Sequence, residues 1–243
     1  MLQLVNAGHK SLADYATIAT RGLMDQIRSL AEPLAGKRVV HVSATAFGGG
    51  VAEINYTLIP LMQDAGLEVE WRIIRGADEF YEVTKAIHNA LQGNPQGLTG
   101  EQQEIFRRYQ ELNAQEFEDD YDFIVIHDPQ PVGMIDHVAD SSAHWIWRGH
   151  IDFSTPNQEV FDFVLPSIKR YDAAIFHMRQ YVPKAEGLPP AYIWPPRSTR
   201  SRRRTWRSPR RTPRTSSISS ASTSSARCSR RSPASTRGRT RSV

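Results

Sequence analysis

The chain has 243 residues, and 30 Lys and Arg against 26 Asp and Glu give it a formal net charge of +4. Residues 197–243 hold 15 of the Arg and no Lys, Asp or Glu, so residues 1–196 carry 15 basic against 26 acidic side chains, a net charge of −11. No apolar run approaches the ~20 residues that span a bilayer, the amino terminus lacks a signal-peptide pattern, and the only cysteine is Cys228. We therefore expect a cytoplasmic protein without membrane contact, and a folded part without a disulfide or a thiolate metal site.

The first 34 residues are predicted to form a helical segment. From Leu12 to about Leu34, apolar side chains recur at the spacing of one helix face, and the pattern ends near a Pro and a Gly. A helix of this length would lead directly into the first predicted strand.

A strand, a glycine-rich loop and a helix follow in that order. The run Arg38–Thr45 is short and rich in β-branched residues, which is typical of a buried parallel strand. Gly48–Gly50 come after it and predict a tight loop. The next helix is expected to end at Gly66. Its predicted apolar face consists of Ile54, Leu58, Leu61 and Met62.

The remaining chain up to residue 196 alternates strand and helix patterns. This alternation predicts an α/β fold, a Rossmann-like parallel sheet with helices on both faces. Strands are predicted at Leu67–Ile74, Asp122–Asp128, His144–Ile151, Ala173–His177 and in the run 191–196. Three helices are predicted between these strands. The first has Phe80, Val83, Ile87 and Leu91 on one face, the second covers 101–120 with an apolar stripe of Ile105, Tyr109 and Leu112, and the third covers Asn157–Tyr171.

Residues 197–243 have a different composition, with 15 Arg, 14 Ser and 7 Thr. So few apolar side chains cannot offset the entropy of ordering, and the sequence predicts a disordered tail. One interpretation takes this tail as a nucleic-acid-binding arm, because such charge would contact phosphates. Trp206 is its only aromatic residue, so specific recognition of bases is not expected.

The glycine loop is the first candidate site. In a parallel sheet, ligands bind beyond the carboxyl ends of the strands, and a helix that begins there offers free N–H groups to an anion. Gly48–Gly50 would let such a ligand approach the backbone, although an ordinary tight turn is the alternative. A dinucleotide fingerprint needs a third glycine where this chain has Glu53. Glu68 and Glu70 nevertheless lie about where a ribose-binding acid would fall, so a nicotinamide-dependent enzyme stays as the alternative.

Two further strand ends carry polar side chains. His127 and Asp128 follow one apolar strand, where a helix cap is the alternative role. Arg148, His150 and Asp152 follow another strand and are flanked by two Trp and a Phe. Aromatic rings beside charged and polar groups suit a sugar, while a salt-bridged strand end is the alternative. No spacing resembles a metal site or a nucleophilic triad.

Four ordered segments together resemble a known family. HVSATAFGGGVAEINYTLIPLMQDAGLEVEWRII, EFYEVTKAIHNALQG, IVIHDPQP and WRGHIDFSTPNQEVFDF are similar to the N-terminal half of the nucleotide-sugar-dependent trehalose synthases, which belong to family 4 of the retaining glycosyltransferases. The resemblance covers roughly Leu34 to Pro196. It implies the N-terminal, acceptor-side domain of a GT-B enzyme that joins glucose from NDP-glucose to free glucose with retention, giving trehalose. No cofactor is expected.

The resemblance also implies roles for individual residues. Gly48–Gly50 would lie against the donor phosphates. His150 and Asp128 match positions that approach the donor sugar and the acceptor in the related trehalose-phosphate synthases, and they are the expected catalytic pair. The further candidates for substrate binding are Glu53, His127, Arg148 and Asp152.

The tail departs from the family, whose members continue from Pro-Pro with Ser-Ile-Asp-Pro-Leu. Deleting one T from the codons CCG TCG ATC GAC CCG CTC gives Pro-Arg-Ser-Thr-Arg-Ser, which is the sequence from Pro196 to Ser201. The expected organisation is therefore a helical segment (1–34), a Rossmann-like domain (35–196) and a frameshift product (197–243). Without a donor domain the chain is expected to be inactive alone, and its uncovered cleft face favours self-association, for example as a homodimer.

Overall fold

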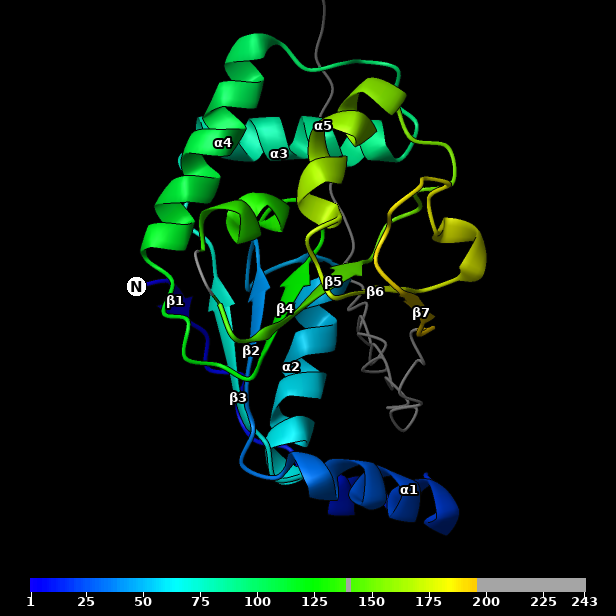
Figure 1. Ribbon diagram of the computed structural model, residues 1–243. Coiled ribbons are helices and arrows are strands. Elements are labelled where there is room, and N and C mark those ends of the chain that lie inside the picture. Colours follow the sequence, from blue (N-terminus) through cyan, green and yellow to red (C-terminus); the bar gives the residue numbers. More distant parts are fainter. Residues whose placement is uncertain (139–140, 196–243) are drawn as a thin grey trace, which may run out of the picture. The chain divides into compact units, whose positions relative to one another are not determined.

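A computed structural model describes residues 1–138 and 141–195 of the chain (Figure 1). The Arg-rich tail lies outside these residues, and so does the prediction that it is disordered. Within the described residues, no helix is long and apolar enough to cross a membrane.

A seven-stranded sheet forms the centre of the fold, in the order β1-β3-β2-β4-β5-β6-β7. The pairs from β3 through β7 are all parallel, as predicted. The edge strand β1 instead runs antiparallel to β3, so the sheet is mixed. Two residues are too few to show a strand periodicity, and the sequence therefore did not reveal β1. The strands are β1 (Gln3–Leu4), β2 (Arg38–Ser43), β3 (Glu68–Ile73), β4 (Phe123–His127), β5 (His144–Gly149), β6 (Ala173–Phe176) and β7 (Ala191–Ile193).

Helices cover both faces of this sheet, as predicted. Alternate residues of β2 point to opposite sides, so that Val40 and Val42 pack with α3, α4 and α5, while Val39 packs with α2. Figure 1 shows α3, α4 and α5 on one side of the sheet and α2 on the other. The α-helices are α1 (Arg21–Ala31), α2 (Gly49–Asp64), α3 (Asp78–Leu91), α4 (Gly100–Gln115) and α5 (Gln158–Ile168), and the 3-10 helices are η1 (Leu12–Tyr15), η2 (Glu32–Leu34), η3 (Val132–His137) and η4 (Arg179–Tyr181).

The single helix predicted from Leu12 to about Leu34 is wrong. The chain forms η1, leaves the helical conformation, and begins α1 only after Thr20. Thr20 has extended backbone angles, and its side-chain oxygen accepts a hydrogen bond from the N–H of Leu23 at 3.3 Å. This N-cap starts a new helix inside what reads as one continuous apolar pattern.

The apolar face predicted for α2 is also wrong. Ile54, Leu58, Leu61 and Met62 are only partly buried. Apolar residues occur all round this helix, so periodicity alone does not identify the side that packs on the sheet. The buried positions of α2 are Ala52, Asn55, Ile59 and Pro60.

The apolar stripe predicted for α4 is correct at Ile105 and Tyr109, which pack against the core, and wrong at Leu112. Leu112 is 47% exposed, whereas the polar side chains of Gln110 and Asn113 are buried. Gln110 accepts from the N–H of Gly133 and donates to a loop carbonyl, and Asn113 bonds both the N–H and the carbonyl of Arg75. These amides satisfy backbone groups of η3 and of two loops that would otherwise be buried without partners.

Candidate functional site

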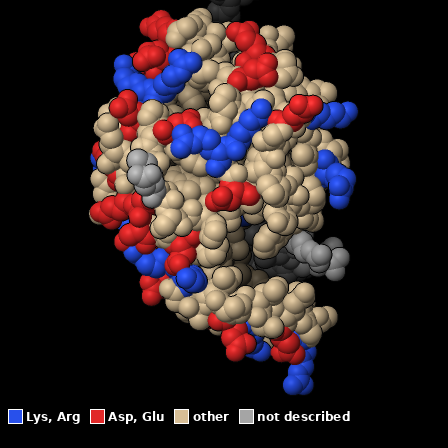
Figure 2. Space-filling model, in the orientation of Figure 1, with Lys and Arg blue, Asp and Glu red and all other residues tan. Residues whose placement is uncertain are grey.

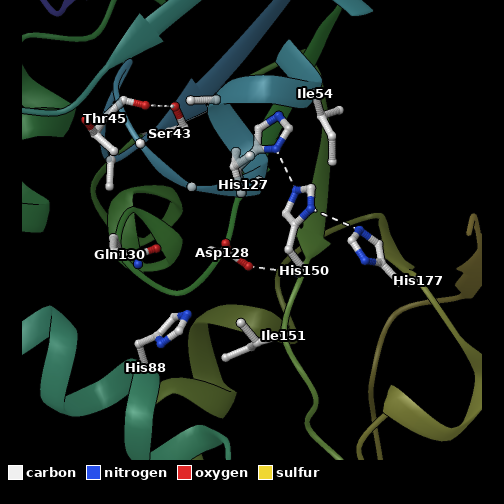
Figure 3. Close-up of a pocket in the computed structure, with 16 residues that line it drawn as sticks. Ser43, Thr45, Ile54, His88, His127, Asp128, Gln130, His150, Ile151 and His177 are labelled. Carbon is white, nitrogen blue, oxygen red and sulfur yellow. Dashed lines mark hydrogen bonds between the residues drawn. The ribbon is translucent and has the colours of Figure 1, made fainter. Parts of the chain in front are cut away.

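A pocket of about 320 Å³ opens at the carboxyl ends of β2, β4, β5 and β6 (Figure 3). Its position agrees with the general rule for ligand sites in parallel α/β sheets. The face of the molecule in Figure 2 carries interspersed acidic and basic side chains, whereas uncharged groups dominate the pocket wall. The wall consists of Ser43–Thr45, Gly48–Ala52, Ile54, His88, His127, Asp128, Gln130, His150, Ile151 and His177.

The glycine loop forms one wall of this pocket. Gly48 and Gly49 have φ values of 69° and 80°, a left-handed conformation that side chains other than glycine rarely adopt. Gly50 has ordinary backbone angles. A Cβ placed on any of the three glycines would meet nothing within 4 Å. The loop therefore leaves open space next to the first turn of α2, where helix N–H groups lack intrahelical partners.

Asp128 links the end of β4 to the end of β5. Its Oδ1 accepts a hydrogen bond from the N–H of His150 at 2.7 Å, and its own N–H donates to the carbonyl of Arg148 at 2.9 Å. Burial raises the pKa of the Asp128 carboxyl to about 7, although the hydrogen bond from His150 and the charge of Arg148 act in the opposite direction. Asp128 can therefore exchange a proton near neutral pH.

Asp128 also has a left-handed backbone, with φ at 62°. Asn adopts this conformation more readily than Ala and keeps a side-chain oxygen for the N–H of His150. At any one pH we expect Asp128→Ala to have a free energy of unfolding about 2–4 kcal/mol below that of Asp128→Asn, since Ala adds backbone strain and leaves the N–H of His150 unpaired. Urea unfolding of both variants measures the difference, and equal losses would contradict this assignment.

Four histidines at the carboxyl edge of the sheet contact one another. His41 lies inside β2 and His127 at the end of β4, and Nδ1 of His41 is 2.9 Å from Nε2 of His127. Nδ1 of His127 is 2.9 Å from Nε2 of His150, and Nδ1 of His150 is 3.0 Å from Nε2 of His177. Figure 3 shows His150 between His127 and His177.

Burial and a nearby cation keep these imidazoles neutral. Burial is the largest cause, and it lowers the pKa of His41 to about 3, lowers that of His150 to about 2, and moves the pKa of His127 well below its usual value. The pKa of His177 is lowered by the same two causes. The positive charge of Arg148 acts in the same direction on all four rings.

Arg148 lies beside the pocket and does not line it. It pairs with His127 in the register of β4 and β5, and it is 7% exposed. Among the described residues, no carboxylate lies within 4 Å of its guanidinium, and its Nε is buried without a partner. Burial lowers the pKa of Arg148, while the charge of Asp128 raises it.

The structure brings together the glycine loop, His127, Asp128 and His150. Glu53 is exposed on α2 and does not line the pocket. Asp152 does not line it either, and its Oδ1 accepts from the N–H of Ser154 at 2.8 Å in a local turn. No group of three or more His, Cys, Asp or Glu in residues 1–138 and 141–195 has the geometry to hold a metal ion.

Sequence reasoning missed His41, His88 and His177. His177 is the last residue of the predicted strand Ala173–His177, and His127 and Asp128 at the corresponding end of the strand Asp122–Asp128 are candidate site residues, so this signal was available. His41 sits inside a strand, and His88 lies on α3, where nothing local indicates that their side chains face other titratable groups.

Comparison with known proteins agrees with this architecture. Residues 41–183 match the family model described as "Trehalose synthase, N-terminal domain". The chain belongs to the trehalose synthase family. It is 49% identical over 201 residues to a trehalose synthase of Rubrobacter xylanophilus, a match that covers 81% of this chain and 48% of that protein. It is 42% identical over 189 residues to a trehalose synthase of Thermococcus litoralis, covering 77% of this chain and 46% of that protein.

The chain thus spans about half the length of the trehalose synthases it matches. Among solved structures, it is similar to the E. coli trehalose-6-phosphate protein bound with UDP-2-fluoro glucose, with a TM-score of 0.50 and 16% identity over 65% of this chain and 48% of that one. At that identity the likeness concerns the fold, which is that of a GT-B glycosyltransferase domain.

Proposed function

We propose that residues 1–196 form the acceptor-side half of a retaining glycosyltransferase that transfers glucose from NDP-glucose to glucose and forms trehalose. The observation that carries this proposal is the pocket itself. In a chain 49% identical to a trehalose synthase, it combines the first turn of α2 with His127, Asp128 and His150 at one edge of the sheet. The loop supplies backbone N–H groups for a phosphate, and the Asp128 carboxyl supplies a hydrogen-bonding group for a sugar hydroxyl.

The division of roles follows from position in the pocket. The open space beside Gly48–Gly50 would take the diphosphate of the donor, whose negative charge grows as it leaves, and the positive end of the α2 dipole would stabilise that charge. Asp128 and His150 face the same pocket from the ends of β4 and β5 (Figure 3). With a pKa of about 7, Asp128 is able to accept or donate a hydrogen bond to a sugar hydroxyl near neutral pH.

Gly50→Ala tests the phosphate role of the loop. A methyl group here meets no protein atom within 4 Å and causes no backbone strain, so the free energy of unfolding should change by less than about 1 kcal/mol. The same methyl group would occupy the space assigned to the donor. In the two-domain enzyme encoded when the reading frame is restored, we expect the KM for NDP-glucose to rise about tenfold, which corresponds to about 1.4 kcal/mol.

Gly100→Ala is the matched control for this variant. Gly100 is the first residue of α4, has ordinary backbone angles and also has open space at its Cβ, but it does not line the pocket. Its KM for NDP-glucose should be that of the parent enzyme. A parental KM in Gly50→Ala would contradict the assignment of the loop to the donor phosphates.

A further inference from the structure

The four histidines form a single continuous row. His41, His127, His150 and His177 come from β2, β4, β5 and β6, which are neighbours in the sheet, and each contact joins Nδ1 of one ring to Nε2 of the next. The repetition of the same pair of atoms gives the row a direction. It starts at the buried ring of His41 and ends at His177, which lines the pocket.

Neutral imidazole chemistry allows only two proton patterns in such a row. Each neutral ring has one N–H donor and one lone pair, and each contact needs one of each. His127 and His150 use both of their nitrogens within the row. A choice of proton position at one ring therefore determines the other three. Burial together with the Arg148 charge opposes a doubly protonated ring in the row.

The buried end of the row distinguishes the two patterns. Nε2 of His41 is buried and has no hydrogen-bond partner among the described residues. In one pattern this atom is an orphaned N–H donor, and in the other it is only an unused lone pair. Orphaned buried N–H groups are rarer in proteins than under-used acceptors, since losing a donor's hydrogen bond to water is costly. The second pattern is favoured, and it puts the proton on Nδ1 in every ring.

We infer that the four histidines of the row act as one hydrogen-bonded unit with each proton on Nδ1. In this unit His41, His127 and His177 are positioning residues for His150. His177 also presents the terminal N–H donor of the row. Nε2 of His150 then accepts from His127, and its Nδ1 donates to His177. With both nitrogens engaged, His150 has no N–H left for a ligand. The polar contact between this row and a ligand in the pocket therefore comes from Nδ1–H of His177, which suits an acceptor oxygen. That this oxygen is a hydroxyl of glucose rests on the proposed function.

The proton pattern is measurable in the full chain without any ligand. Long-range ¹H–¹⁵N correlation spectra of protein labelled with ¹⁵N-histidine distinguish a protonated from an unprotonated ring nitrogen. At pH 7 we expect all four rings of the row to show a protonated Nδ1 and an unprotonated Nε2. A proton on Nε2 of any of the four, a doubly protonated ring, or averaging between the two tautomers overturns the inference.

Substitution of His177 tests the positioning role separately. In His177→Phe the ring of His150 loses the acceptor for its Nδ1–H, so the ¹H and ¹⁵N signals of that group should shift, while His41 still favours the proton on Nδ1. His177→Gln restores an acceptor oxygen and should return these signals toward their parental positions. His144→Gln is the matched control, because His144 is exposed at the opposite end of β5 and should leave the row unchanged. An unaltered His150 signal in His177→Phe overturns the positioning role.

These results are independent of the proposed reaction. A failure of the tautomer pattern leaves the trehalose-forming activity of the two-domain enzyme open to its own assay. Conversely, absence of that activity leaves the spectrum of the four rings unchanged.

Discussion

Acidification from pH 7 to pH 4 is expected to unfold the domain formed by residues 1–195. The histidines in the row are neutral when folded, and their pKa values in the folded protein lie below the unfolded value of about 6.5. Below pH 6.5 the unfolded chain therefore binds more protons than the folded one, and stability falls as the pH falls. For His41 this window extends down to about pH 3.

Asp128 acts in the opposite direction. Its folded pKa of about 7 is above its usual value, so between pH 7 and pH 4 the folded protein holds a proton that the unfolded chain lacks. This carboxyl therefore adds stability as the pH falls. Three histidines have strongly lowered pKa values, and each takes up a proton on unfolding. The proton that Asp128 releases on unfolding offsets one of these three. The histidines are His41, His127 and His150. Unfolding then takes up a net of about two protons, which lowers the free energy of unfolding by about 3 kcal/mol per pH unit below 6.5.

Two variants with opposite effects make this prediction specific. His41→Phe removes one buried imidazole, and the slope of unfolding free energy against pH should decrease by about one proton, or ~1.4 kcal/mol per unit. Asp128→Asn removes the opposing carboxyl, and the slope should increase by a similar amount. Urea unfolding at several pH values between 4 and 7 measures all three slopes. A parent protein whose stability is independent of pH in this range would contradict the neutral row.

The sheet could be predicted from the sequence because its evidence is local. Short β-branched runs such as Arg38–Thr45 indicate parallel strands, and polar residues directly after them share one edge of the sheet by geometry alone. That rule was sufficient to place Gly48–Gly50, His127, Asp128 and His150 in one candidate site. It needed no knowledge of side-chain conformation.

The features that escaped prediction depend on contacts between distant segments. His41 and His177 are 136 positions apart, and only the strand order brings both into one row. The buried amides of α4 escaped because their partners are loop backbone groups elsewhere in the chain. The buried side of α2 could not be predicted because apolar residues occur all round this helix. In each case the local pattern was compatible with several packings.

Restoring the reading frame at the Pro196 codon is expected to have the largest effect on activity. We propose that residues 197–243 are the product of a one-base deletion. When the lost base is put back, the codons that now read Pro-Arg-Ser-Thr-Arg-Ser read Pro-Ser-Ile-Asp-Pro-Leu, as in the family. The groups that bind the nucleotide would come from the domain encoded beyond this point. Without them, the donor is neither held nor oriented, and most of the catalytic advantage of a bound, positioned donor is lost.

The measurement is trehalose formation from glucose with ADP-, UDP- or GDP-glucose. The present chain should give no product above background with any of the three donors. The frame-restored enzyme should form trehalose at least about 10³-fold faster than that background, which corresponds to about 4 kcal/mol of transition-state stabilisation. Insertion of two bases at the same codon is the matched control, because it changes the same site and opens the third frame, and it should remain inactive. Turnover by the present chain, or the lack of a long open frame after any one-base change at this codon, would refute the proposal.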